Sequence, residues 1–138
     1  MLSLVVLAAA GCNPGVRWEL RPYSEAHQLA QNSGKLTFVY LRNWYMVECT
    51  DFEEKVLKDP EVLAETHTMV CVPLNFDYDR PLAEQWQLKK PPAYVIVGPD
   101  DQVLARHDAP VRRDELLLGI RTARDKFAAR DRSPATSP

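Results

Sequence analysis

The sequence predicts a single α/β domain in which a mixed central β-sheet is covered by helices on both faces. Strand-like and helical segments alternate along the chain, which is typical of a sheet with crossover helices. Residues 36–41 are apolar almost without alternation, as expected for a central strand buried on both faces. Residues 93–97 and 102–105 flank a Gly-Pro-Asp-Asp turn, which predicts a hairpin. At 138 residues the chain is long enough for one core and too short for two.

The first two elements are a short strand and a helix. Residues 16–20 alternate apolar and polar side chains and predict a half-buried strand. Ser24 offers a helix N-cap, and a Gly-containing turn ends the helix ten residues later. The inward face of this helix is expected to carry Ala26, Leu29 and Ala30.

The second helix follows the central strand and starts near Met46. Cys49, Phe52 and Val56 recur at helical spacing and should face the core. Pro60 interrupts the helix, because proline disfavours helical backbone at the residue before it. The clustered pair of glutamates on this helix, Glu53 and Glu54, predicts a solvated face.

The remaining predicted elements lie between residue 61 and the last helix. A short helix is predicted over 61–65 and a strand over 70–74, in which Pro73 removes one hydrogen-bond donor of the ladder. Residues 80–88 predict a third helix, and the last helix starts near Arg113.

The N-terminus predicts an export signal. Residues 1–11 carry no charge and are too short to span a bilayer, which takes about 20 apolar residues. They look like the apolar part of a secretory signal. The ending Ala-Ala-Gly-Cys resembles the lipobox of bacterial lipoproteins, in which the cysteine, here Cys12, is acylated and becomes the mature N-terminus. The alternatives are a signal of another kind or a structural N-terminal strand.

These observations divide the chain into four parts. Residues 1–11 are the lipoprotein-type signal segment, 12–15 the anchor and a short linker, and 16–129 the domain. Residues 130–138, rich in Ser, Pro and Thr towards the end, are expected to form a disordered tail. We therefore expect an exported protein of the bacterial cell envelope, anchored to a membrane by lipid.

Charge and histidine spacing restrict the partners. The net charge of −2 and the absence of a Lys/Arg run argue against nucleic acid. His27, His67 and His107 are isolated and lack the spacing of metal ligands, so they predict surface or internally hydrogen-bonded histidines. We expect no metal and no cofactor.

The most informative feature is half of a redox motif. A C-x-x-C pair, placed after a buried strand and at the start of a helix, would fall at Met46 and Cys49. A thioether cannot ionise, and thiol–disulfide exchange starts with attack by a thiolate. Cys71, in a predicted strand, is expected to be a second unpaired thiol.

The residues around this half-motif resemble a known family. Residues 49–53 (Cys-Thr-Asp-Phe-Glu), 59–62 (Asp-Pro-Glu-Val) and 92–97 (Pro-Ala-Tyr-Val-Ile-Val) are similar to the thioredoxin superfamily, specifically to exported thioredoxin-like domains of the DsbD C-terminal type. The resemblance covers about residues 18–127. It implies a thioredoxin-like fold.

The resemblance also implies roles for single residues. Cys49 matches the second, resolving cysteine, and Met46 falls on the nucleophile. Tyr40 stands where many members have a buried acid, and it is a poor proton acceptor. Pro92 matches the cis-proline. Pro91 precedes it and lacks the N–H that normally bonds an extended substrate.

A client groove is implied beside these prolines. Its predicted residues are Trp44, Tyr45, Met46, Pro91, Pro92 and Tyr94. Large aromatic residues retained beside a missing nucleophile favour a binding surface. The alternative is that they fill local packing.

Two functions follow from the sequence. The first is a non-catalytic module that binds or assembles a protein or peptide client. The alternative is a thiol–disulfide exchange protein that acts through the single Cys49. The absence of a second nearby cysteine favours the first function over an enzyme.

Overall fold

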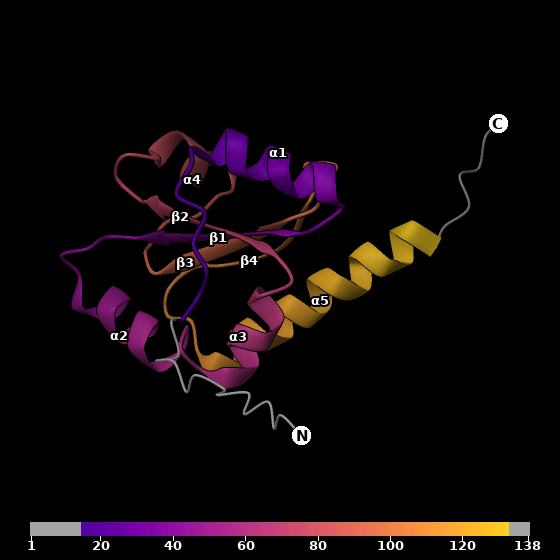
Figure 1. Cartoon of the computed structure of the whole chain (residues 1–138). Coiled ribbons are helices and arrows are strands. Elements are labelled where there is room, and N and C mark those ends of the chain that lie inside the picture. Colours follow the sequence, from indigo (N-terminus) through magenta and orange to yellow (C-terminus); the bar gives the residue numbers. More distant parts are fainter. Residues whose placement is uncertain (1–14, 133–138) are drawn as a thin grey trace, which may run out of the picture.

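The computed structural model describes residues 15–132, which form an α/β domain (Figure 1). The elements in chain order are α1 Tyr23–Ser33, β1 Thr37–Arg42, α2 Val47–Lys55, α3 Pro60–Thr66, β2 Val70–Asn75, α4 Arg80–Gln85, β3 Ala93–Val97, β4 Val103–His107 and α5 Arg113–Arg132. The predicted alternation of strands and helices, closed by a hairpin and a last helix, is confirmed.

The four strands form one mixed sheet in the order β2-β1-β3-β4. Strand β1 pairs with β2 in parallel and with β3 antiparallel, and β3 pairs with β4 antiparallel. Strand β1 is therefore internal, and its first five residues are buried. This explains why its sequence is apolar without alternation.

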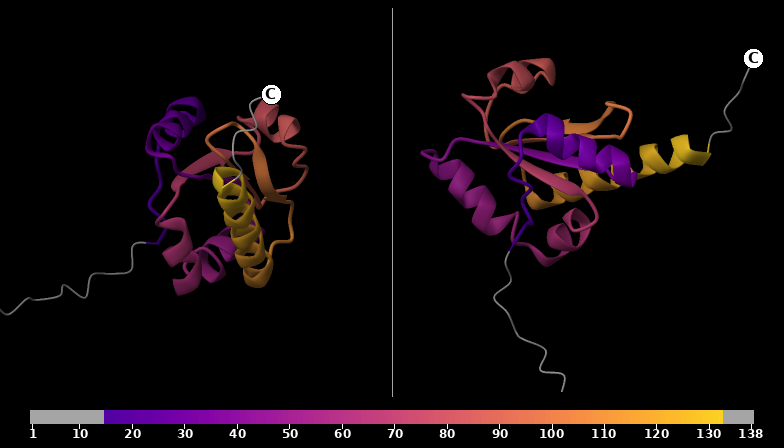
Figure 2. Two further views of the ribbon diagram at one scale, coloured as in Figure 1. Left: turned by 90° about the vertical axis from the view of Figure 1, so that its right-hand side faces the viewer. Right: turned by 45° about the horizontal axis from the view of Figure 1, so that its top comes forward.

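Helices cover both faces of the sheet, as Figures 1 and 2 show. Phe38 and Tyr40 of β1 belong to a core shared with α2, α3 and α5. Val39 and Leu41, which point to the other face, belong to a core shared with α1 and α4. Alternate residues of a strand point to opposite faces, so β1 contributes side chains to both cores.

The predicted strand at 16–20 is wrong, because that segment makes only a single bridge. Trp18 pairs with Cys71, and the Glu19 N–H donates to the Cys71 carbonyl at 2.7 Å. Two residues further along β2 stands Pro73, which has no N–H with which to continue the ladder. Leu20 is accordingly 82% exposed.

Helix α1 begins two residues earlier than predicted. Pro22 holds the N-cap position without a side-chain hydrogen bond, and Ser24 lies inside the first turn. Leu29 was expected to face the core but is exposed. Ala26, His27 and Ala30 are the buried residues of this helix, and the partly buried Tyr23 packs against the same core.

Two other helices differ in length from the prediction. Helix α4 ends at Gln85 rather than near residue 88, since Gln87 adopts a left-handed backbone conformation with φ of 57°. Helix α5 continues to Arg132, past the predicted domain end at 129.

The predicted signal segment with its lipidation site at Cys12 lies outside the described residues, as does the tail after Arg132. Within residues 15–132, none of the helices has the length and apolar character needed to cross a membrane.

Candidate functional site

The half-motif lies where the segment after the internal strand β1 enters helix α2. The chain leaves the sheet at Arg42 and enters the helix at Val47, with Met46 as the N-cap residue in an extended conformation. Met46 is half-buried at the helix start. Cys49 lies about one turn inside the helix, as the resemblance implies.

The thiol of Cys49 is closed off from solvent. Cys49 is 0% exposed, and its Sγ accepts a hydrogen bond from the Asn43 N–H at 3.4 Å. Burial raises the pKa of this thiol, and hydrogen bonds from the Asn43 N–H and the Tyr40 hydroxyl only partly oppose that rise. Cys49 in this structure is therefore a protonated, packed side chain rather than an accessible nucleophile.

The second thiol is equally buried. Cys71 is 2% exposed, and burial raises its pKa to about 12. Neither Cys49 nor Cys71 forms a disulfide, so the expectation of two unpaired thiols is confirmed for the described residues.

A buried tyrosine lies beneath the motif, at the position where the resemblance implies an acid. Tyr40 is fully buried, and its hydroxyl lies 3.4 Å from the Cys49 carbonyl oxygen and 3.3 Å from Oε2 of Glu53. Burial and the nearby Glu53 charge raise the pKa of Tyr40. The hydroxyl is consequently a donor here, not a base.

The structure contradicts the prediction for Glu53. It was expected on a solvated face, but it is half-buried and pairs with Arg42 at 3.2 Å as well as with Tyr40. No sequence signal indicated this, because the partners lie on β1, and only the packing of α2 on that strand brings them together.

Two aromatic side chains form an exposed surface beside the motif. Trp44 is 71% and Tyr45 62% exposed, and their rings meet edge to face with centroids 5.9 Å apart. The Tyr45 hydroxyl donates to Asp77 at 2.9 Å, which anchors the ring to the loop after β2. Val47, 69% exposed, continues this surface along the chain. We call Trp44, Tyr45 and Val47 the aromatic surface.

Tyr94 does not belong to this surface, although the sequence analysis placed it there. It is 2% exposed and packs on Phe38 within the core that α5 covers. Pro91 and Pro92 are buried, and the bond between them is cis, as predicted.

A pocket of about 370 Å³ lies between α2 and the loops that carry Pro92 and Pro110. It is lined by Glu48, Asp51, Phe52, Lys55, Val56, Lys90, Pro92, Ala109, Pro110 and Val111. Of the six predicted groove residues, only Pro92 lines it. The contribution of residues 109–111 was not predicted, since they lie far from the motif in sequence.

The three histidines lie apart from the motif. His27 is buried, with Nδ1 2.8 Å from the Thr37 hydroxyl and Nε2 2.7 Å from Oδ1 of Asp101, so it joins α1 to β1 and to the turn before β4. Within residues 15–132 no cluster of three or more His, Cys, Asp or Glu side chains could hold a metal ion.

Comparison with known proteins gives structural matches. No family model matches the chain. No curated protein matches it in sequence. A thioredoxin from Thermus thermophilus is 25% identical with a TM-score of 0.72, and the match covers 89% of this chain and 98% of the thioredoxin.

Two further solved structures share the fold. A putative disulphide-isomerase from Bacteroides thetaiotaomicron is 18% identical with a TM-score of 0.69, over 80% of this chain and 94% of that one. A DsbH oxidoreductase is 16% identical with a TM-score of 0.65, over 79% and 84%. Together with the sheet order, these matches show that the chain has the thioredoxin-like fold.

Proposed function

We propose that this protein is a redox-inactive thioredoxin-like module that binds polypeptide clients without forming covalent intermediates. One observation carries the proposal: the only cysteine of the half-motif, Cys49, is 0% exposed, and the other motif position is Met46. Exchange needs an attacking thiolate and a second thiol to release the mixed disulfide. Met46 supplies neither, and Cys49 lacks both ionisation and access.

The surface around the motif has the properties of a binding site. Trp44 and Tyr45 expose large rings at low cost in side-chain entropy, the kind of residue that dominates protein interfaces. The pocket between α2 and Pro92 offers a concave, mainly apolar site that an apolar client side chain can enter.

The cellular setting is part of the same proposal. The uncharged apolar run that ends in Cys12 supports export and a lipid anchor, which would hold the domain in the bacterial cell envelope. The residues from Cys49 to Glu53 and the Asp59-Pro60 break support kinship with exported domains of the DsbD C-terminal type. The client is accordingly a protein or peptide of the envelope.

Binding can be tested with a client that cannot take part in thiol chemistry. The probe is an unfolded polypeptide whose cysteines have been carboxymethylated, and its affinity for the protein is measured by fluorescence anisotropy. Trp44→Ala and Tyr45→Ala should each weaken binding by about tenfold, the loss typical of a central interface residue. Leu29→Ala, which truncates an exposed apolar side chain on α1, is the matched control and should change nothing.

Two results would contradict the proposal. One is binding that Trp44→Ala and Tyr45→Ala leave unchanged. The other is capture of a disulfide-containing probe as a mixed disulfide that disappears in Cys49→Ser, which would establish the single-cysteine exchange function instead.

A further inference from the structure

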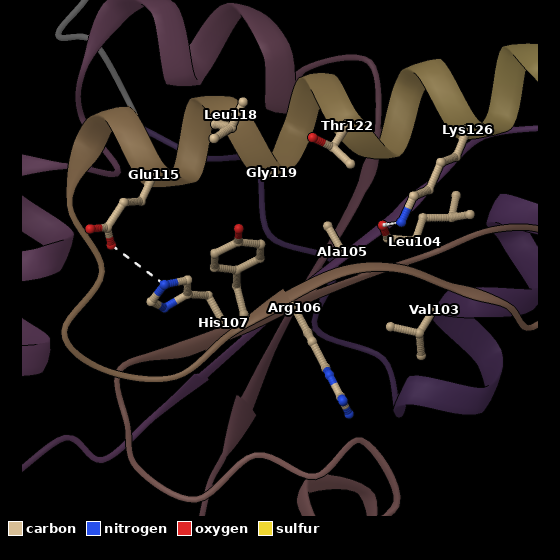
Figure 3. Close-up of a pocket in the computed structure, with 11 residues that line it drawn as sticks. Val103, Leu104, Ala105, Arg106, His107, Glu115, Leu118, Gly119, Thr122 and Lys126 are labelled. Carbon is tan, nitrogen blue, oxygen red and sulfur yellow. Dashed lines mark hydrogen bonds and ion pairs between the residues drawn. The ribbon is translucent and has the colours of Figure 1, made fainter.

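A second concave surface lies between strand β4 and helix α5 (Figure 3). It has a volume of about 550 Å³ and shares no lining residue with the pocket beside Pro92. We call it the β4–α5 groove. One wall is formed by all five residues of β4, and the other by residues of α5.

The strand wall is a backbone edge. Successive side chains of a strand point to opposite faces of a sheet, so a groove that lies on one face touches alternate residues. The β4–α5 groove touches every residue from Val103 to His107, and Figure 3 shows Arg106 pointing away from the helix while the strand still lines the groove. The groove therefore runs along the main chain of β4. Strand β4 is the last in the sheet order, so that edge has no partner strand among the described residues.

The helix wall is one stripe of α5. Glu115, Leu118, Gly119, Thr122 and Lys126 follow the spacing of residues on a single helical face. Leu118, 65% exposed, adds an apolar side chain at the rim. The groove is thus bounded by an open strand edge on one side and by a helix face on the other.

Gly119 keeps the groove open at its floor. A Cβ atom built on Gly119 would lie 2.0 Å from the Tyr94 hydroxyl oxygen, so this position has no room for a side chain. Tyr94 is 2% exposed, yet it lines the groove, and its hydroxyl has no hydrogen-bond partner within residues 15–132. A buried side chain thus presents an unused polar atom to the groove.

The two ends of the groove differ in charge. At the end of β4, Glu115 forms an ion pair with Arg112 at 3.2 Å, and Nε2 of His107 lies 3.6 Å from the same carboxylate. At the start of β4, the ammonium of Lys126 donates to the Leu104 carbonyl at 3.3 Å (Figure 3). No carboxylate among the described side chains pairs with Lys126. One cation therefore lacks a counter-charge at that end.

We propose that the β4–α5 groove binds an extended peptide, which adds to β4 as a fifth, antiparallel strand and places a carboxylate on Lys126. Strand addition uses the main-chain groups of an open sheet edge for affinity and the flanking helix for specificity. An antiparallel strand ends at the start of β4, where Lys126 lies, so the carboxylate belongs at or near the C-terminus of the peptide. This site is separate from the aromatic surface, and it does not depend on the proposed function.

The test uses the full chain and a fluorescein-labelled hexapeptide of alternating Thr and Val with a free C-terminal carboxylate. We expect saturable binding, together with slower hydrogen exchange of the β4 amides that face the groove. A peptide with N-methylated main-chain amides should not bind, because it cannot form the ladder. Failure of the free peptide to bind or to protect β4, or equal binding of the N-methylated peptide, would overturn the proposal.

Variants locate the site. Thr122→Trp, which fills the groove, should reduce affinity by at least about tenfold. Leu118→Trp, at an exposed position where misfolding is not a concern, should act in the same direction. Lys126→Met should weaken binding by about threefold, as expected for an exposed charge pair, and the amidated peptide should show the same loss with no further loss in the variant. Arg121→Met, which removes a cation of α5 outside the groove, is the control and should bind as wild type does.

Other occupants would be visible in the same measurements. A dimer that dissociates in Thr122→Trp would show that the groove receives a second copy of this chain. Protection of β4 in the free protein that is lost when residues 133–138 are deleted would show that it receives the tail. Either result would overturn the assignment of a separate peptide partner.

Discussion

The main-chain N–H of Asn43 donates to the sulfur of Cys49 across 3.4 Å, while the side-chain amide of the same Asn43 lies 3.8 Å from the sulfur of Met46. One residue of the loop thus contacts both sulfur atoms of the half-motif. The contact to Cys49 satisfies a thiol that is otherwise surrounded by core side chains. The half-motif is therefore a packed structural element, and its chemistry is limited by burial as well as by the missing cysteine.

The first prediction concerns thiol access. In a Cys12→Ser background, an aromatic disulfide reagent at mildly alkaline pH should label neither Cys49 nor Cys71 in the folded protein, because both are buried and burial raises both pKa values. Both thiols should react after unfolding in denaturant, which serves as the control. Rapid labelling of Cys49 in the native state would show that the motif opens.

The second prediction concerns turnover. The wild-type domain should not catalyse dithiol-dependent reduction of a protein disulfide, whereas Met46→Cys should gain measurable activity, because it supplies a thiol at the helix start next to Cys49. Tyr40 and Pro91 should keep that activity below that of a full enzyme, since the first is no base and the second donates no hydrogen bond to a substrate. The control is Met46→Cys combined with Cys49→Ser. Wild-type turnover that vanishes in Cys49→Ser would contradict the prediction.

The third prediction is a pH dependence. Asp59 caps α3 through the N–H groups of Glu61 and Val62, and its bond to Arg113 at 2.6 Å lowers its pKa below the ordinary 3.8. A carboxyl whose pKa is lower in the folded state stabilises the fold above its unfolded pKa, and this contribution is lost as the pH falls through the folded value. The free energy of unfolding should therefore fall as the solution is acidified below about pH 4.

Asp59→Asn isolates that effect. Asparagine still caps a helix but carries no charge for Arg113. The variant should be less stable than wild type at neutral pH and should show a shallower loss in acid, measured by urea unfolding over a pH series. Asp51→Asn, which changes an exposed carboxylate of α2, should leave the acid slope unchanged. A variant with the wild-type slope would show that another group causes the loss.

The fourth prediction tests the contact between Gly119 and Tyr94. Replacing a helical glycine by alanine ordinarily stabilises by about 1 kcal/mol, but the new Cβ of Gly119→Ala would lie 2.0 Å from the Tyr94 hydroxyl oxygen. Overpacking costs about 1–3 kcal/mol, so the variant should be destabilised. Tyr94→Phe removes the hydroxyl and should rescue part of the loss. Additive effects of the two substitutions in thermal unfolding would contradict this.

The fifth prediction concerns the anchor. If Cys12 is acylated, the intact mass of protein extracted from membranes should match a chain that begins at Cys12 and carries lipid. Stable attachment needs more than one acyl chain, because a single chain binds membranes only marginally. Cys12→Ser should release the protein from the membrane fraction. A mature chain that starts elsewhere without lipid mass would disprove the anchor.

Only part of the candidate site could be predicted from the sequence. The position of Met46 and Cys49 at the start of a helix followed from the order of apolar and polar residues, and so did the buried strand before them. The burial of Tyr94 and the contacts of Glu53 did not follow from the sequence. Every residue of β3 is buried, and which face of the strand meets α5 and which meets α1 and α4 depends on helices far away in sequence.

The resemblance to thioredoxin-like domains implied the cis bond before Pro92. The sequence by itself determined the alternation of strands and helices, the hairpin and the presence of a thioether rather than a thiol at Met46. These depend on local periodicity and on residue chemistry, which the chain carries with it. Only the tertiary structure decided that Cys49 is buried, that residues 16–20 form a single bridge near Pro73, and that the edge strand β4 and helix α5 line one groove. Burial, register and grooves arise between segments that are distant in sequence, so the packing of the whole domain sets them.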